Sequence, residues 1–231
     1  MSDIPVWPAK LTRDQKKAAN QRSKAYYAAL KGGARNAGWR FVQQQLFRQT
    51  DGWFINVLSS PLWERGARVR IVVKPMALDP LFWDIVGLGA NEKLPLSFRA
   101  IGAWVLRPAW TEEMVALNTM DGQQLAADVA DWSDRRANAI LQTTSLESML
   151  CELPDGPAMF GQRLALAICL HILNGNLDEA MRLCRTKGPD SPTHPEEGGF
   201  VTGLEGNTKI SFVDQAIAWI ERKQGSAIRP T

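Results

Sequence analysis

The chain of 231 residues is 45% hydrophobic and 22% charged, a balance that is typical of a globular protein and excludes disordered and collagen-like classes. Its N-terminus lacks the apolar core of a signal peptide, and the longest apolar stretch, 164–173, contains His171 and is too short to cross a bilayer. The odd number of cysteines, three, without a secretion signal argues against a disulfide framework, and no CxxC pair occurs. We therefore expect a cytoplasmic protein that does not associate with membranes.

Charge is distributed unevenly along the chain, although the net charge is only +3. Residues 1–110 contain 17 Lys and Arg against seven Asp and Glu, whereas residues 111–231 contain ten against 17. Polarity of this size can steer a charged partner toward one end of the molecule. It can equally reflect two halves of the chain that attract one another.

The first predicted element is a basic amphipathic helix over 11–37. Thr12 is a suitable N-cap, and the Gly32-Gly33 pair ends the helix or breaks its last turn. The apolar positions between them are modest, so we expect one broad face of this helix to lie in solvent.

A run of strands is predicted next. Residues 39–49 and 53–59 are apolar segments separated by Asp51-Gly52, a strong hairpin turn signal. Apolar and basic side chains alternate along residues 66–78. One face would carry Val69, Ile71 and Val73, and the other Arg68, Arg70 and Lys74. Such alternation predicts an antiparallel sheet with one face in solvent.

The sheet is predicted to be interrupted and then completed. Residues 79–86 have helical spacing with Pro80 in the first turn. Residues 97–107 are read as a fourth strand, closed by Pro108. These segments together predict a meander of about four antiparallel strands with one helical insertion.

From Thr111 onward the predicted elements are helical. Thr111 is expected to cap a first turn that contains Glu112 and Glu113. Further helices are predicted over 121–141, 158–173 and 176–185. Two more are predicted to begin at a capping box of Thr144 and Glu147 and at Ser211. A Gly- and Pro-rich segment, 187–208, is predicted to be a flexible loop.

The order of elements favours an α+β fold: an N-terminal helix, an antiparallel sheet of about four strands, and then a C-terminal set of helices that pack on it. Residues 1–110 would form the helix and sheet, and residues 111–231 the helical part, within one compact domain.

Residues suited to catalysis are scarce. His171 lies in the most apolar predicted helix two positions after Cys169, so the two side chains would point in different directions. His194 lies in the acidic predicted loop, and the GxG at 87–89 lacks the third glycine of a dinucleotide-binding loop. We expect no metal and no cofactor.

Two features exceed the background composition. The first is nine tryptophans, which supply buried area in a core or anchors in an interface. The second is the basic strand face of Arg68, Arg70 and Lys74. With Trp104, these three residues form the candidate binding site. Edge protection of the sheet by charged side chains is the alternative explanation of the basic face.

The order of these segments resembles a known family. Gly38-Trp-Arg-Phe41 after a helix, the hairpin around Asp51-Gly52-Trp-Phe-Ile-Asn-Val57 and a strand with Arg70-Ile-Val-Val73 resemble a bacterial family of uncharacterised α+β domains, domain of unknown function 4304. The resemblance covers about residues 11–185. It implies an α+β fold and an interaction role like that of immunity proteins of bacterial toxin systems, and it implies no catalytic residues.

Three functions remain open at this point. The first is a non-catalytic protein-binding module, possibly toxin-neutralising, with another protein as partner and a homodimer as a further option. The second is association with nucleic acid through the basic N-terminal half. The third is an enzyme that acts on an anionic substrate in a cleft lined by Arg68, Arg70, Trp104 and Glu112.

Overall fold

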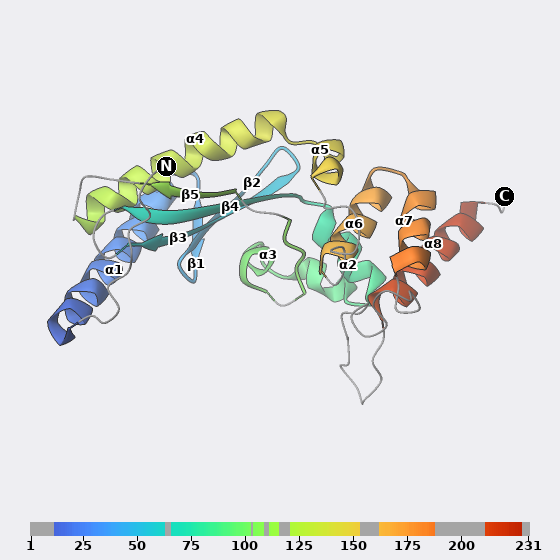
Figure 1. The fold of residues 1–231 in the computed structure, drawn as a ribbon, viewed down its shortest axis with the longest axis horizontal. Helices are drawn as coiled ribbons and strands as arrows, with labels where there is room; N and C mark the ends of the chain where they lie inside the picture. The colour runs from blue at the N-terminus through green and yellow to red at the C-terminus, as the bar shows by residue number, and fades with distance from the viewer. Residues whose placement is uncertain are drawn as a thin grey trace.

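A computed structural model describes residues 12–62, 66–102, 104–108, 111–115, 121–152, 162–187 and 211–227. Figure 1 shows a twisted sheet with two long helices beside it, followed by a group of shorter helices that extends the molecule. In chain order the elements are α1 (Arg13–Ala34), the 3-10 turn η1 (Arg35–Ala37), β1 (Arg40–Val42), β2 (Gln45–Thr50), β3 (Trp53–Pro61), β4 (Ala67–Pro75), α2 (Leu78–Ile85), the 3-10 turn η2 (Gly89–Lys93), α3 (Phe98–Ile101), β5 (Thr111–Val115), α4 (Gly122–Thr143), α5 (Leu146–Cys151), α6 (Gln162–Leu173), α7 (Leu177–Lys187) and α8 (Phe212–Ala227).

The sheet has five antiparallel strands in the order β1-β2-β3-β4-β5. The β2–β3 hairpin turns at Asp51 and Gly52, both at positive φ, as the Asp-Gly signal predicts. The strand predicted over 39–49 is instead divided in two. Gln43 and Gln44 adopt φ of 41° and 66°, which makes a second tight turn between β1 and β2.

Helices α1 and α4 lie side by side on one face of the sheet. Their apolar sides enclose a core with the alternate residues of the strands, namely Leu46, Ile55, Val57, Val69, Ile71 and Val73. Tyr26 of α1 is fully buried, and its hydroxyl donates to Ser59 Oγ of β3 at 2.8 Å. Gly122 lets α4 begin against α1, because a Cβ there would lie 3.1 Å from the Tyr26 nitrogen. We call β1–β5 with α1 and α4 the sheet unit.

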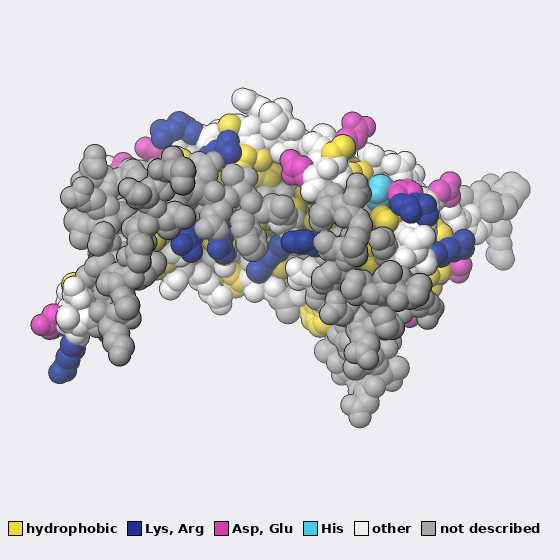
Figure 2. Space-filling model, viewed as in Figure 1, with side chains coloured by type: hydrophobic (Ala, Val, Ile, Leu, Met, Phe, Trp, Pro, Cys, Tyr) yellow, Lys and Arg dark blue, Asp and Glu magenta, His cyan; other side chains and the backbone are white. Residues whose placement is uncertain are grey.

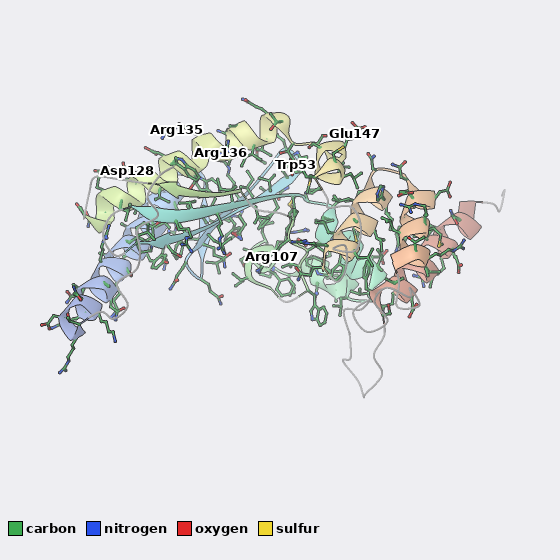
Figure 3. The ribbon with its side chains drawn as sticks, in the orientation of Figure 1. Trp53, Arg107, Asp128, Arg135, Arg136 and Glu147 are labelled. Atoms are coloured by element: carbon green, nitrogen blue, oxygen red, sulfur yellow. The ribbon has the colours of Figure 1, made fainter. Side chains whose placement is uncertain are left out.

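The remaining long helices form a second core. Helix α6 is central, since seven consecutive residues from Leu164 to Leu170 are buried. It contacts α2, α5, α7 and α8, and the rings of Phe82 in α2 and Phe212 in α8 stack at 5.5 Å between centroids. We call α2 and α5–α8 the helical cluster. Trp53, at the end of the sheet nearest α5 (Figure 3), packs against both cores.

Two predicted elements differ from the structure. Residues 97–107 are not a strand: Phe98–Ile101 is the short helix α3, and the chain then lies against Lys74, whose ammonium donates to the Arg99 and Leu106 carbonyls. The fifth strand is instead β5, where a capped helical turn was predicted. Thr111–Val115 pairs with Ala67–Ile71 of β4, and a sheet edge competes for backbone hydrogen bonds that a helical turn would otherwise use.

Helix boundaries mostly agree with the predictions. Thr12 caps α1 in a full capping box with Gln15, and Asp121 accepts from the Gln123 amide at the start of α4. The capping box predicted from Thr144 and Glu147 is shifted by one residue, to Ser145 with Ser148. The loop predicted over 187–208 lies outside the described residues, apart from Lys187.

The α+β class and its order of elements are confirmed, with five strands in place of about four. The two cores do not divide at residue 110, because β5 and α4 belong to the sheet unit and α2 belongs to the helical cluster. None of the described helices has the length and apolar character needed to cross a membrane.

Candidate functional site

Lys74 lies in a buried cluster of charge on the face of the sheet opposite α1 and α4. Its Nζ is 2.9 Å from Asp79 Oδ1 and 2.8 Å from Oδ2, and the two side chains are 1% and 0% exposed. Arg99 Nη1 approaches Asp79 Oδ2 at 3.4 Å, and the Leu106 amide donates to Oδ1 at 3.2 Å. Burial lowers the pKa of Lys74, and the charge of Asp79 opposes that shift.

This geometry corrects the prediction that Lys74 belongs to a solvent-exposed basic face. The strand does alternate as predicted, but at Lys74 the outer face is covered by α2, α3 and the chain at Leu106. A buried ammonium needs a partner, and Asp79 supplies it. Lys74 therefore holds the sheet unit against α2 and does not contact a ligand in solvent.

Trp104 is also separate from the predicted basic face. It has a positive φ of 63°, its carbonyl accepts a hydrogen bond from Trp83 Nε1 at 2.6 Å, and its ring packs against the helical cluster. The enzyme cleft that the sequence predicted required Trp104 and Glu112 beside Arg68 and Arg70. Glu112 of β5 does lie opposite Arg70 in the sheet register. Trp104 does not line the groove in which those two arginines lie, so the residues do not form the predicted cleft.

Arg68 and Arg70 do lie together, in a groove of about 320 Å³ at one end of the β3–β4 hairpin. Leu58 is directly opposite Arg70 in the sheet register, and Ser60 is opposite Arg68. Pro61 and Leu62 complete the lining. Arg68 and Ser60 are exposed, and the other four residues are half-buried. We call these six residues the arginine groove.

The arginine groove combines apolar contact surface with two fixed cations. Strand pairing positions Arg68 and Arg70 on the same face, two residues apart, as alternation in a strand requires. A guanidinium offers a planar fork of donors that matches a carboxylate; both arginines also interact within the chain, where Arg70 lies opposite Glu112 of β5 in the sheet register. Leu58, Pro61 and Leu62 can contact an apolar side chain beside such a carboxylate. The residue alternation in the sequence identified the arginines, whereas the apolar lining depends on the hairpin partner strand.

Basic side chains also lie outside the arginine groove. Figure 2 shows Lys and Arg in a row across the middle of the molecule, over the sheet and toward the helical cluster. Arg107 lies in this region (Figure 3), is exposed, and donates to the Ala100 carbonyl at 3.2 Å. The row therefore includes at least one arginine that the sequence analysis did not select, because Arg107 was assigned to a strand.

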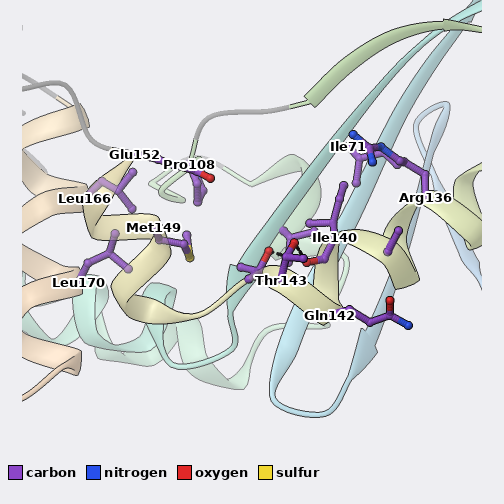
Figure 4. A pocket seen from close by; sticks show the side chains of 13 residues that line it. Ile71, Pro108, Arg136, Ile140, Gln142, Thr143, Met149, Glu152, Leu166 and Leu170 are labelled. Carbon is purple, nitrogen blue, oxygen red and sulfur yellow. Dashed lines mark hydrogen bonds between the residues drawn. The ribbon is translucent and has the colours of Figure 1, made fainter.

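A larger cavity of about 530 Å³ lies where the sheet unit meets the helical cluster (Figure 4). Its apolar side is formed by β4, α4, α5 and α6, with Ile71, Ile140, Met149, Leu166 and Leu170 among the lining residues, and its polar residues include Arg136, Gln142 and Glu152. The Thr143 and Thr144 hydroxyls donate to the Ile140 carbonyl within α4. Both hydroxyl hydrogens are thus used inside the helix, whereas Arg136, Gln142 and Glu152 give the cavity a largely polar lining.

Cys169 and Cys184 are buried, whereas Cys151 is exposed. Burial raises the pKa of the Cys169 thiol. Burial is also the main cause that raises the pKa of the Cys184 thiol, to about 12, so both groups are neutral thiols at neutral pH. Burial lowers the pKa of His171. Across the described parts of the chain, no group of three or more His, Cys, Asp or Glu side chains is arranged to hold a metal ion.

Comparison with protein-family models, curated proteins and solved structures finds no match to this chain. The resemblance to domain of unknown function 4304 therefore remains an expectation from the sequence.

Proposed function

We propose that the protein is a non-catalytic protein-binding module that captures a segment of another protein in the arginine groove. The observation that carries the proposal is the composition of this groove, in which Arg68 and Arg70 lie beside Leu58, Pro61 and Leu62. Interface cores are enriched in arginine, and energetically near-neutral contacts around such an anchor exclude water. The expected partner segment presents a carboxylate next to an apolar side chain.

The charge of the chain supports a partner of this kind. The groove belongs to the half of the sequence that carries 17 Lys and Arg against seven Asp and Glu. Charge complementarity would accelerate the encounter with an acidic protein surface and set the orientation of binding. The finer proposal, drawn from the sequence resemblance, is that the module neutralises a toxin in the bacterial cytoplasm.

The proposal is tested by site-specific photo-crosslinking in the source cell. A photoreactive phenylalanine replaces Ser60, which is exposed at the rim of the groove, and in a second variant replaces Lys223, which is exposed on α8. We expect one protein to be crosslinked from position 60 and not from position 223. The same band should disappear when Arg68→Glu and Arg70→Glu are added.

The control reverses charge elsewhere. Arg135 and Arg185 are exposed on α4 and α7, and Arg135→Glu with Arg185→Glu changes the net charge by the same amount as the groove substitutions. The position-60 crosslink should survive this control. Absence of any position-60 crosslink, or its persistence after charge reversal in the groove, would contradict the proposal.

A further inference from the structure

A line of exposed cations runs along α1 on the side away from the core. Arg13, Lys17, Lys24 and Lys31 are all exposed, and at 100° per residue they lie within about 40° of one another around the helix axis. We call these four residues the basic stripe. The residues that α1 buries, Tyr26, Leu30 and Ala34, lie about 75° to 155° from the middle of the stripe around the helix axis.

The stripe is extended and little opposed by acidic side chains on its own helix. Eighteen residues separate Arg13 from Lys31, which corresponds to about 27 Å of helix. Asp14 is the one carboxylate within α1, and it lies about 100° from Arg13 around the axis. Asn20 and Gln21, together with Lys16, line the same shallow surface as the stripe. Figures 1 and 2 show that the N-terminal end of α1 projects beyond the sheet and carries basic side chains there.

We infer that the basic stripe binds the phosphate backbone of double-stranded nucleic acid without sequence preference. About 27 Å of helix spans about eight base pairs of duplex at 3.4 Å each. Lys and Arg side chains that neutralise phosphates release counterions, which supplies most of the affinity in sequence-independent binding. Single strands would need aromatic side chains on which bases stack. Tyr26 is buried and the Tyr27 hydroxyl donates to the Ser59 carbonyl at 3.1 Å, so α1 directs its tyrosines toward the sheet.

This inference does not rest on the proposed protein-binding role, because the stripe and the arginine groove share no residue. Arg22 illustrates the separation: it lies about 180° from Arg13 around the axis, and its Nη1 donates to the Leu62 carbonyl at 2.6 Å.

The test measures binding of the full chain to duplexes of about 20 base pairs with unrelated sequences, from about 20 to 200 mM salt. We expect equal affinities for the different sequences and a slope of log affinity against log salt near −3.6, about −0.9 for each of four phosphate contacts. Lys17→Gln, Lys24→Gln and Lys31→Gln together should weaken binding at least about tenfold at low salt and reduce the slope by about 2.7.

Two matched variants interpret the result. Arg135, Arg163 and Arg185 are exposed outside α1, and their simultaneous change to Gln lowers the net charge equally but should alter affinity by no more than about twofold. Lys17→Arg, Lys24→Arg and Lys31→Arg should retain binding, because the charge is kept. Absence of binding at the lowest salt, equal losses in the two glutamine variants, or binding to poly-glutamate but not to the duplex would overturn the inference.

Discussion

The sheet unit and the helical cluster bury their cores in different ways. The strands of the sheet unit bury one face against α1 and α4, and α3 covers part of the second face around Phe47 and Phe54, so polar groups such as Arg68 and Arg70 remain on its uncovered part. In the helical cluster, α6 is buried over seven consecutive residues, and its Leu166 and Leu170 line the cavity where the cluster meets the sheet unit. The difference explains why both proposed binding surfaces, the arginine groove and the basic stripe, belong to the sheet unit.

The two regions are joined by polar as well as apolar contacts. Lys74 of β4 and Asp79 of α2 form the buried ion pair at the joint, and Trp53 packs against both cores. Removing one partner of such a buried pair lowers the free energy of unfolding strongly, because the remaining charge is buried away from water without a partner. The joint is therefore the place where the two regions can be separated by substitution.

The largest expected effect comes from breaking that pair. Lys74→Met leaves the Asp79 carboxylate buried without its ammonium partner, so we expect a loss of about 3 kcal/mol in the free energy of unfolding. Urea denaturation followed by far-UV circular dichroism measures it. Lys74→Met combined with Asp79→Leu should recover part of the loss, because the Leu106 amide and Arg99 also lose their Asp79 partner. An unchanged midpoint in the single variant would show that the pair does not hold the joint.

A matched pair of cavity substitutions tests whether the two cores unfold together. Leu46 in the sheet unit and Leu170 in the helical cluster are both 0% exposed, and each change to Ala should cost about 2–4 kcal/mol. If the joint couples the cores, each variant will shift one common transition seen by both tryptophan fluorescence and circular dichroism. Two separated transitions in either variant would show that the regions unfold independently.

A smaller effect concerns the polar contact inside the sheet unit. Tyr26→Phe removes the hydrogen bond to Ser59, so we expect a loss of about 1 kcal/mol at neutral pH. Burial raises the pKa of Tyr26 above its ordinary value of 10.0. The folded state thus favours the neutral phenol, and its contribution is complete below pH 10 and lost as pH rises beyond it.

The check on this pH dependence is urea unfolding at a series of pH values between about 8 and 11. The free energy of unfolding of the wild type should fall more steeply above pH 10 than that of Tyr26→Phe. Tyr27, whose pKa is also raised by burial, should leave a residual slope in the variant. Identical slopes in the two proteins would contradict the assignment.

The smallest stability effect is expected at the proposed binding residues. Lys17, Lys24 and Lys31 are exposed on α1, and changing all three to Gln should alter the free energy of unfolding by less than about 0.5 kcal/mol at each site. Thermal unfolding monitored by circular dichroism provides the measurement. A much larger loss would mean that the stripe contributes to the fold rather than to binding.

The sequence predicted the elements whose signals are local. Alternation at Val69, Ile71 and Val73 identified β4, and the Asp51-Gly52 pair identified the β2–β3 hairpin, because period and turn chemistry are encoded within a few residues. Strand β5 was missed because Thr111-Glu-Glu resembles a helix N-terminus, and its pairing with β4 is a contact between distant parts of the chain.

The candidate site was predicted only in part, for the same reason. Arg68 and Arg70 share a face as their spacing indicates. Alternation alone could not show that Lys74, on that same face, is covered by α2 and paired with Asp79. The five-residue separation of Lys74 and Asp79 was a usable signal. A lysine in an apolar strand that is soon followed by an aspartate indicates a buried ion pair, because a buried charge needs a partner.

The central claim, that the arginine groove captures an acidic partner segment, is tested most directly by the affinity of the crosslinked partner for three forms of the protein. Isothermal titration would compare the wild type, Arg68→Gln with Arg70→Gln, and Arg135→Gln with Arg185→Gln. We predict at least about tenfold weaker binding for the groove variant and at most about twofold for the control, since arginines that contact the partner contribute more than exposed charges away from the interface. Equal affinities for the groove variant and the wild type would contradict the claim.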